Sequence, residues 1–271
     1  MNHLLRDLAP VSAAAWEEVE SEAERRLRTY LGARRLVDFR GPHGWERSAI
    51  DLGRAEAVEG PDQADLRVQR RQVLPLMELR ATFTLERRQL DDVDRGRPDP
   101  DLGPLEEAAR VIARAETAAV FHGYPAGGIH GITARSAHRP VSLGSEPARY
   151  SEAVASAVQM LMGAGVGGPF GLALSSDLWA KVVETVEDGY PLMEHLRRTL
   201  EGGSIVWAPG VDGAVVVSQR GGDFLFDSGQ DLSLGYLTHD AETLTLYLEE
   251  SFTFRVLEGD AAIALETAGT D

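Results

Sequence analysis

The chain has 271 residues, and its 27 basic and 43 acidic side chains give a formal net charge of −16. This charge argues against a nucleic-acid-binding protein, which needs a concentrated basic surface, and against attachment to an anionic membrane. The absence of cysteine excludes disulfide bonds, thiolate metal sites and a cysteine nucleophile. The sequence has no signal-peptide pattern and no run of about 18 apolar residues. It is typical of a cytosolic globular protein with one large or two small domains.

The N-terminal part predicts one amphipathic helix followed by a short strand. Ser12 is a good N-cap, and apolar residues recur behind it at helical spacing from Trp16 to Leu27. The helix carries its acids first and its bases last, as the helix dipole prefers. Residues 35–39 (RLVDF) then indicate a short strand that ends in a turn.

A charged ribbon follows. Residues 48–75 form two extended runs around the turn sequence EGPD. Two strands alone are marginally stable in water, because they bury little apolar surface. We therefore expect this ribbon either to lie against another subunit or to stand as an exposed hairpin on its own domain.

The rest of the chain predicts a mixed α and β structure. Apolar and polar residues alternate strictly along 77–85, which indicates a strand. The next segments are expected to be a short helix at 86–96, a long helix at 104–122 that stops before Gly123, a helix capped by Ser151, a strand at 170–175, helices at 176–186 and 192–200, and strands at 204–209 and 213–219. From 244 to 256 the apolar residues fall on even positions, so the last third is predicted to be mainly β.

The sequence offers little catalytic chemistry. It contains no phosphate-binding loop, nucleophile elbow or zinc-protease motif. His122, His130 and His138 are eight residues apart, which is not a tight ligand spacing, and we interpret them as scattered surface or loop residues. Asp91, Asp92 and Asp94 could bind a cation, but a solvated helix face is the simpler interpretation. The Ser175–Ser176 pair is predicted to cap a helix.

The glycine-rich stretch at 220–236 (RGGDFLFDSGQDLSLGY) could be either a phosphate-binding loop or a pair of strands. Its glycines do not form a dinucleotide-binding motif and lead into no helix, so a phosphate loop is not favoured. Phe224 and Phe226 face one way and Leu225 the other, and the alternation resumes at Leu232. The stretch is predicted to be a bent or bulged strand pair with glycine at the bends.

Six segments, taken in order, resemble the shell proteins of family 1 (linocin-type) encapsulins. These segments are LLRDLAPVSAAAW, ARRLVDFRGPHGWE, LPLMELRATFTL, LDDVDRGRPDPDL, the pair GGDF and GQDLSLGY, and ESFTFRV. The resemblance covers residues 3 to about 265. It implies an α+β fold of the tailed-phage major-capsid type (Hong Kong phage type), with a peripheral domain, an axial domain and an extended E-loop.

The resemblance also implies domain boundaries. The N-terminal helix region and the start of the peripheral domain would occupy 1–47, the E-loop 48–74, the peripheral domain with its spine helix 75–124, the axial domain 125–222, and the return strands of both domains 223–271. The charged ribbon would then be the E-loop, whose faces a neighbouring subunit covers.

The implied function is structural. Family members assemble into an icosahedral nanocompartment in the bacterial cytoplasm, and the smallest such shell has about 60 copies. They enclose a cargo enzyme, usually a ferritin-like iron oxidase or a dye-decolourising peroxidase, which connects them with iron storage and oxidative stress. The chain itself would not be an enzyme and would carry no catalytic, metal-binding or cofactor-binding residues. Its expected partners are its own copies and the cargo, with no nucleic acid and no membrane.

By the same resemblance, the C-terminal peptide of the cargo docks in a groove on the inner wall. The residues placed near it are Leu5, Leu8, Arg34, Asp38, Phe39, Asp231, Leu232 and Leu234. Apolar pockets would give affinity, the charged residues would fix polar atoms of the peptide, and many copies would add avidity. The competing interpretation of these residues is core or subunit packing.

The loop EDGYP corresponds to the lining of the five-fold pore. Glu187 and Asp188 would form an acidic ring that attracts small cations, followed by Gly189 and Tyr190. Some relatives have a histidine where this chain has Gly189, which places metal gating in doubt. Some relatives also stack a flavin on a tryptophan, and Arg88 stands at that position here, so no flavin is expected.

Two other functions stay open at this stage. A prophage capsid protein would share the fold, but the N-terminal helix begins too early for a scaffolding segment. The single lysine and single asparagine, Lys181 and Asn2, also do not suit a covalent lysine–asparagine shell. A free-standing cytosolic enzyme with an unrecognised site is the third possibility.

Overall fold

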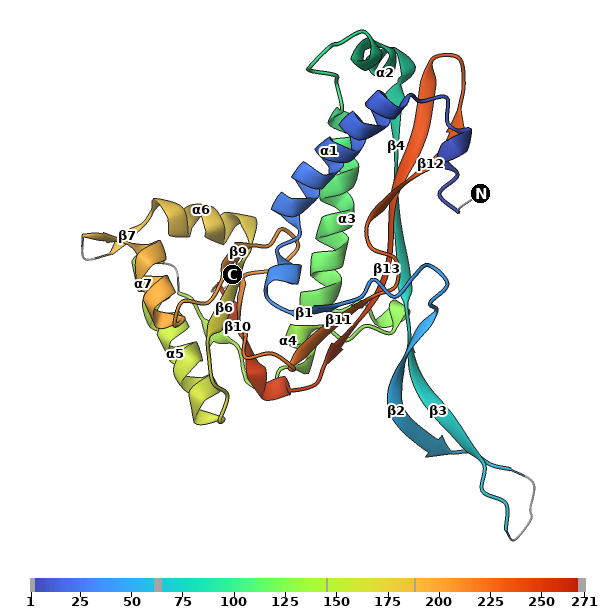
Figure 1. The fold of residues 1–271 in the computed structure, drawn as a ribbon. Coiled ribbons are helices and arrows are strands. Elements are labelled where there is room, and N and C mark those ends of the chain that lie inside the picture. The colour runs from blue at the N-terminus through green and yellow to red at the C-terminus, as the bar shows by residue number, and fades with distance from the viewer. Residues whose placement is uncertain (1–2, 61–64, 145, 188, 268–271) are drawn as a thin grey trace.

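The computed structural model describes residues 3–60, 65–144, 146–187 and 189–267. The chain forms two bodies and a projecting arm (Figure 1). One body contains a five-stranded sheet and two long helices that pack together, and the second contains another five-stranded sheet with four described helices. The arm is a two-stranded ribbon that points away from both bodies. The first body is called the peripheral domain below, the second the axial domain, and the ribbon the arm.

The peripheral sheet is organised around one long strand. Its members are β1 (Asp38–Arg40), β4 (Met77–Glu86), β11 (Phe224–Ser228), β12 (Ser233–His239) and β13 (Thr243–Val256). Strand β13 pairs antiparallel with β4, with β12 and with β11, and β1 adds to β11 in parallel. The segment 244–256, whose apolar residues fall on even positions, is therefore part of a single continuous strand.

Helices α1 (Ala13–Tyr30) and α3 (Gly103–Phe121) pack together, and α3 lies against this sheet, with α2 (Arg87–Asp94) at one end. The predicted N-cap of α1 is confirmed, because the Ser12 hydroxyl accepts a hydrogen bond from the Ala15 amide. The predicted stop of α3 is also confirmed, since Gly123 follows the C-cap with φ of 92°. The shared core contains Val19, Leu105, Ile112, Phe83 and Leu246.

The axial domain has a second sheet in the order β5 (Val141–Ser142), β14 (Ala262–Glu266), β10 (Ala214–Ser218), β6 (Phe170–Leu174) and β9 (Ile205–Trp207). The helices of this domain are α4 (Ile132–Arg135), α5 (Tyr150–Gly163), α6 (Ser176–Glu184) and α7 (Leu192–Thr199). Ser175 caps α6 as predicted, by accepting a hydrogen bond from the Leu178 amide. The predicted cap of α5 is wrong. That helix begins at Tyr150, and the Ser151 hydroxyl instead donates a hydrogen bond to Glu187.

Short segments connect these elements. The hairpin β7 (Val186–Glu187) and β8 (Tyr190–Pro191) forms the far tip of the axial domain (Figure 1). Single turns of 3₁₀ helix occur at Arg6–Leu8, Ala33–Arg35, Pro125–Gly127, Pro147–Arg149 and Gly259–Ala261. No described helix is long and apolar enough to cross a membrane.

The arm consists of β2 (Ala49–Ala57) and β3 (Gln69–Pro75). Most of its side chains are exposed, and neither hydrophobic core includes a residue of β2 or β3 among its described members. The two ends of the arm are adjacent, because the Leu76 amide donates a hydrogen bond to the Ser48 carbonyl. The arm is therefore a module attached to the fold rather than a part of either core.

Candidate functional site

A groove of about 550 Å³ opens between α1 and the start of β12. Helix α1 supplies apolar side chains to one wall, among them Leu27. The opposite wall carries Leu232 and Leu234, and Arg34 and Asp231 lie at its charged end. The groove thus combines apolar side chains with the Arg34 cluster, and the ion pairs Arg6–Glu20 and Arg28–Glu24 also line it. This composition suits an extended peptide.

Four of the eight residues predicted for a groove line it together: Arg34, Asp231, Leu232 and Leu234. Leu5 packs against the peripheral core instead, and Leu8 is exposed beside the start of α1. Asp38 lies elsewhere, since its carboxylate accepts a hydrogen bond from the Gly222 amide at 2.6 Å. Phe39 contributes indirectly, because its ring lies 5.0 Å from the Arg34 guanidinium.

Arg34 is the centre of an ionic cluster that joins three elements. Its Nε donates to Glu116 Oε2 of α3 at 2.7 Å, its Nη1 to Asp231 Oδ1 at 2.6 Å, and its Nη2 to Glu250 Oε2 of β13 at 2.8 Å. The guanidinium also lies over the rings of Phe39 and Phe226. This set of contacts ties the groove to the interior of the peripheral domain.

The electrostatics of the cluster are dominated by burial. Glu116 and Glu250 are 0% and 1% exposed. Burial raises the pKa of Glu250 well above its ordinary value, the nearby Glu116 charge raises it further, and Arg34 opposes both. Burial also disfavours the charged form of Arg34, but the surrounding carboxylates outweigh that effect and raise its pKa. Arg34 therefore stays charged.

Glu116 and Glu250 were missed by reasoning from the sequence, although the sequence carries a signal for both. Glu116 falls on the buried face of α3, at helical spacing between Ile112 and Ala119. Glu250 occupies an even position of β13, on the same face of the strand as Leu248 and the phenylalanines that follow. An acid inside an otherwise apolar stripe indicates a buried ionic contact.

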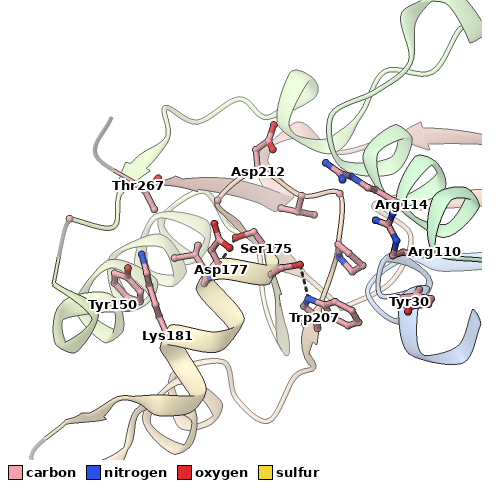
Figure 2. Close-up of a pocket in the computed structure, with 17 residues that line it drawn as sticks. Tyr30, Arg110, Arg114, Tyr150, Ser175, Asp177, Lys181, Trp207, Asp212 and Thr267 are labelled. Atoms are coloured by element: carbon pink, nitrogen blue, oxygen red, sulfur yellow. Dashed lines mark hydrogen bonds between the residues drawn. The ribbon is translucent and has the colours of Figure 1, made fainter. Parts of the chain in front are cut away.

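A larger cavity of about 690 Å³ lies between α3 and α6 (Figure 2). Arg110 and Arg114 border it from α3, while Asp177 and Lys181 border it from α6. The Trp207 indole donates a hydrogen bond to the Ser176 hydroxyl at its edge. No described histidine lines it, so it contains no serine–histidine pair of the kind that activates a nucleophile. Its polar lining does not form a recognisable catalytic arrangement.

The described part of the chain also contains no group of three or more histidine, aspartate or glutamate side chains that could hold a metal ion. Of the three histidines interpreted as surface or loop residues, His130 is exposed and His138 lies in a loop, as predicted, whereas His122 forms the C-cap of α3. The His122 ring bonds to the Asp212 amide and to Thr133, and His138 lies near the Asp260 carbonyl. Both are half-buried structural residues.

Comparison with known proteins identifies the family. A family model described as "Encapsulating protein for peroxidase" matches residues 1–253. A type 1 encapsulin shell protein of Rhodospirillum rubrum is 48% identical, with 98% of this chain and 96% of the relative covered. The corresponding proteins of Rhodococcus erythropolis and Mycobacterium tuberculosis are 44% and 42% identical, with 98% of this chain and 100% and 99% of those proteins covered. The chain belongs to the encapsulin shell protein family. It is a structural shell protein and not an enzyme, which removes the enzyme alternative.

Solved structures confirm the capsid fold of this encapsulin shell protein. A virus-like particle from Pyrococcus furiosus matches with a TM-score of 0.62 at 17% identity, covering 93% of this chain and 99% of that one. The capsid of an empty GTA particle matches with a TM-score of 0.55 at 20% identity, covering 88% and 90%. These likenesses establish the fold alone, and they agree with the predicted tailed-phage capsid type.

The loop predicted to line a pore lies on the β7–β8 hairpin of this encapsulin chain. Gly189 has φ of 82° at the turn, and Tyr190 is 62% exposed. The Glu187 carboxylate accepts a hydrogen bond from Ser151 at 2.6 Å, so one of its oxygens is engaged by α5. Asp188 lies outside the described residues. The predicted flavin position, Arg88, is exposed on α2.

Proposed function

We propose that this encapsulin chain forms a closed shell that packages a cargo enzyme in the bacterial cytoplasm, and that the cargo's C-terminal peptide docks in the groove between α1 and β12. The observation that carries this proposal is the combination of apolar walls, Leu27, Leu232 and Leu234, with an ionic cluster at Arg34 and Asp231. An extended peptide could bury alternate side chains against the walls and satisfy polar atoms at the cluster.

The cargo that we propose is a dye-decolourising peroxidase or a ferritin-like iron oxidase. The name of the matching family, which mentions a peroxidase, supports the first of these. The described residues supply no catalytic arrangement that we recognise, so the chemistry would belong to the cargo. Iron storage or protection against oxidative stress would follow from which of the two enzymes is enclosed.

For the assembly we propose about 60 copies, the smallest icosahedral shell. With a chain mass of 29.4 kDa, light scattering coupled to size exclusion should give a mass of about 1.8 MDa. Negative-stain images of the same peak should show uniform hollow particles. A monomer or a small oligomer under gentle conditions would refute the closed shell, and a larger uniform particle would refute only the copy number.

The docking groove is tested by Asp231→Arg. This change reverses the charge at the exposed end of the cluster, and it should leave assembly intact but reduce cargo loading at least about tenfold, through loss of a charge-assisted contact. The measurement is the cargo-to-shell ratio of particles purified after co-expression with the enzyme encoded beside the shell gene. Glu17→Arg is the matched control, because Glu17 is exposed on α1 and has no ion pair among the described residues. If Asp231→Arg shells contained as much cargo as wild-type shells, the groove would not be the docking site.

At the β7–β8 hairpin we propose a five-fold pore, with Glu187 and Asp188 supplying negative charge that attracts small cations. We also propose that the shell carries no stacked flavin, because the exposed Arg88 offers no aromatic face. A flavin absorbance spectrum that co-purifies with intact, empty shells would contradict the second point.

A further inference from the structure

The Arg34 cluster holds more negative charge than one cation can balance. Three carboxylates, from Glu116, Glu250 and Asp231, contact one guanidinium. Asp231 is 43% exposed at its side chain, so water can solvate it, but the other two are fully buried. Any excess charge inside the cluster therefore belongs to Glu116 and Glu250.

These two buried carboxyl groups are close to each other. The same nitrogen, Arg34 Nη2, lies 2.6 Å from Glu116 Oε2 and 2.8 Å from Glu250 Oε2. The two oxygens are therefore no further apart than the sum of those distances. Each residue also keeps a second buried oxygen, Oε1, that accepts no hydrogen bond from any described residue. Two carboxylates at such a separation in a dry site do not both ionise.

We propose that Glu116 and Glu250 are positioning residues of the groove: the pair shares one proton and carries one negative charge, and that charge holds Arg34 where it orients Asp231 for a docked peptide. The proposal rests on the proposed function only where it calls the groove a docking site. The shared proton and the orientation of Asp231 are properties of the empty shell and can be measured there.

Among the described residues, few charged groups face the pair. The charged groups that face Glu250 are Glu116 from α3, Arg34 from the turn after α1, and Asp231 from the start of β12. The aromatic rings of Phe39 and Phe226 lie beneath the guanidinium and contribute no charge. The free Oε1 atoms of Glu116 and Glu250 leave room for the shared proton on either carboxyl group.

The amide of Leu232 reports on this arrangement without any ligand. Its N–H donates to Asp231 Oδ1 at 2.8 Å, and the same oxygen accepts from Arg34 Nη1 at 2.6 Å. If Arg34 leaves its position, Asp231 loses its partner and the Leu232 amide loses protection. Hydrogen exchange at this amide therefore measures the orientation that the pair maintains.

The test compares four assembled shells: the wild type, Glu116→Gln, Glu250→Gln, and the double variant. Each single variant removes the shared proton but keeps one carboxylate for Arg34, so exchange of the Leu232 amide should stay within about twofold of the wild type. The double variant removes both charges, and exchange should rise at least about tenfold. Equal, additive increases in the two single variants would overturn the shared charge, because each residue would then act alone.

Measuring Leu232 amide exchange at several pH values shows whether the charge of the Glu116–Glu250 pair, rather than its packing alone, positions Arg34. The folded pKa of Glu250 lies above its unfolded value, so the protonated pair is lost as the pH rises through the folded pKa. As the pH rises through that folded pKa, Leu232 exchange, corrected for its intrinsic pH dependence, should increase in the wild type, because two ionised carboxylates then repel each other beside Arg34. It should stay flat in either single variant, where no second charge can form. A flat wild-type profile would contradict the proposal.

Infrared spectroscopy covers the case in which the double variant fails to fold. A protonated carboxyl group has a carbonyl band that ionised carboxylates lack, and it should be present in wild-type shells at neutral pH. It should disappear in Glu116→Gln and also in Glu250→Gln, but persist in Glu24→Gln, which alters an exposed ion pair with Arg28. A wild-type spectrum without the band would overturn the proposal. Normal exchange and infrared results with no cargo loading would refute only the docking function.

Discussion

Gly32 shows how a single small residue fixes the junction between the two domains. It follows the last turn of α1 with φ of −67°, a value that any residue adopts, so its backbone does not require glycine. A β-carbon at this position would overlap the carbonyl oxygen of Trp207 at the end of β9. Close approach of the two backbones, and not conformational freedom, therefore explains the glycine.

We expect Gly32→Ala to destabilise the chain by about 2–4 kcal/mol, because the backbone of Trp207 cannot move aside as a flexible side chain could. The measurement is the thermal unfolding midpoint of the purified protein. Gly163→Ala is the control, since a β-carbon there meets nothing within 4 Å and φ is not positive. An unchanged midpoint for Gly32→Ala would show that the two segments separate easily.

At the scale of residues, the sequence predicts caps and exposed patterns better than buried polar contacts. Ser12 and Gly123 carry local signals that act within a few residues, and both predictions are confirmed. Ser151 has the same local signal, but its hydroxyl bonds to Glu187 on another element. The Glu116–Arg34–Glu250 contacts join residues far apart in the sequence. The only local signal for them is that each glutamate interrupts a row of apolar residues, one on α3 and one on β13.

At the scale of elements, His122 joins the end of α3 to the loop before β10. Its Nε2 accepts a hydrogen bond from the Asp212 amide at 2.9 Å, so this nitrogen carries no proton. Nδ1 therefore carries it and donates to the Thr133 hydroxyl, which in turn donates to the Phe121 carbonyl. The neutral tautomer is thus fixed by its three neighbours, and protonation would place a donor against the Asp212 amide.

Because of these His122 contacts, we expect the folded protein to lose stability in acid. Burial lowers the pKa of His122, and the Asp212 charge opposes the effect only in part. Because the folded pKa lies below the unfolded value of about 6.5, stability is lost as the pH falls through that value. The thermal midpoint should fall by about 2 °C more in the wild type than in His122→Gln between about pH 7.5 and pH 5.5. Identical pH profiles would remove His122 as the cause.

The elements themselves were predicted well where periodicity is long. The helices at 13–30 and 103–121 and the strand at 77–86 lie within a few residues of their predicted bounds. The topology was not derivable from pattern alone, because β13 pairs with three strands from three parts of the chain. The resemblance to a family implied the fold type but did not state these pairings. Of the groove residues that the resemblance implied, Arg34 and Asp231 contact each other, whereas the carboxylate of Asp38 accepts a hydrogen bond from the Gly222 amide.

At the scale of the whole molecule, the arm lies outside the parts of the chain that stabilise the fold of one copy. The described residues of β2 and β3 belong to neither hydrophobic core, yet the strands expose backbone edges and apolar side chains such as Val73. Exposed edges of this kind are stabilised by pairing or by cover from another chain. The arm is therefore expected to contribute to contacts between copies and little to the stability of one copy.

Replacing residues 49–75 by an Asn-Gly turn tests this separation. The Ser48 carbonyl already accepts a hydrogen bond from the Leu76 amide, so a short turn can join the two ends. The far-ultraviolet circular dichroism of both sheets and of the helices should be retained, whereas light scattering should show loss of the large particle. Assembly of the shortened chain into full shells would contradict the role given to the arm.

The position of the last strand has a consequence for synthesis on the ribosome. Strand β14 lies inside the axial sheet, between β5 and β10, and β13 is the central strand of the peripheral sheet. Neither sheet can be completed until the final segments of the described chain have left the exit tunnel. A nascent chain therefore cannot present a finished surface to its neighbours, even when many ribosomes translate one message side by side. The order of the strands therefore delays any contact between copies that needs a finished sheet until nearly all of the described chain has been made.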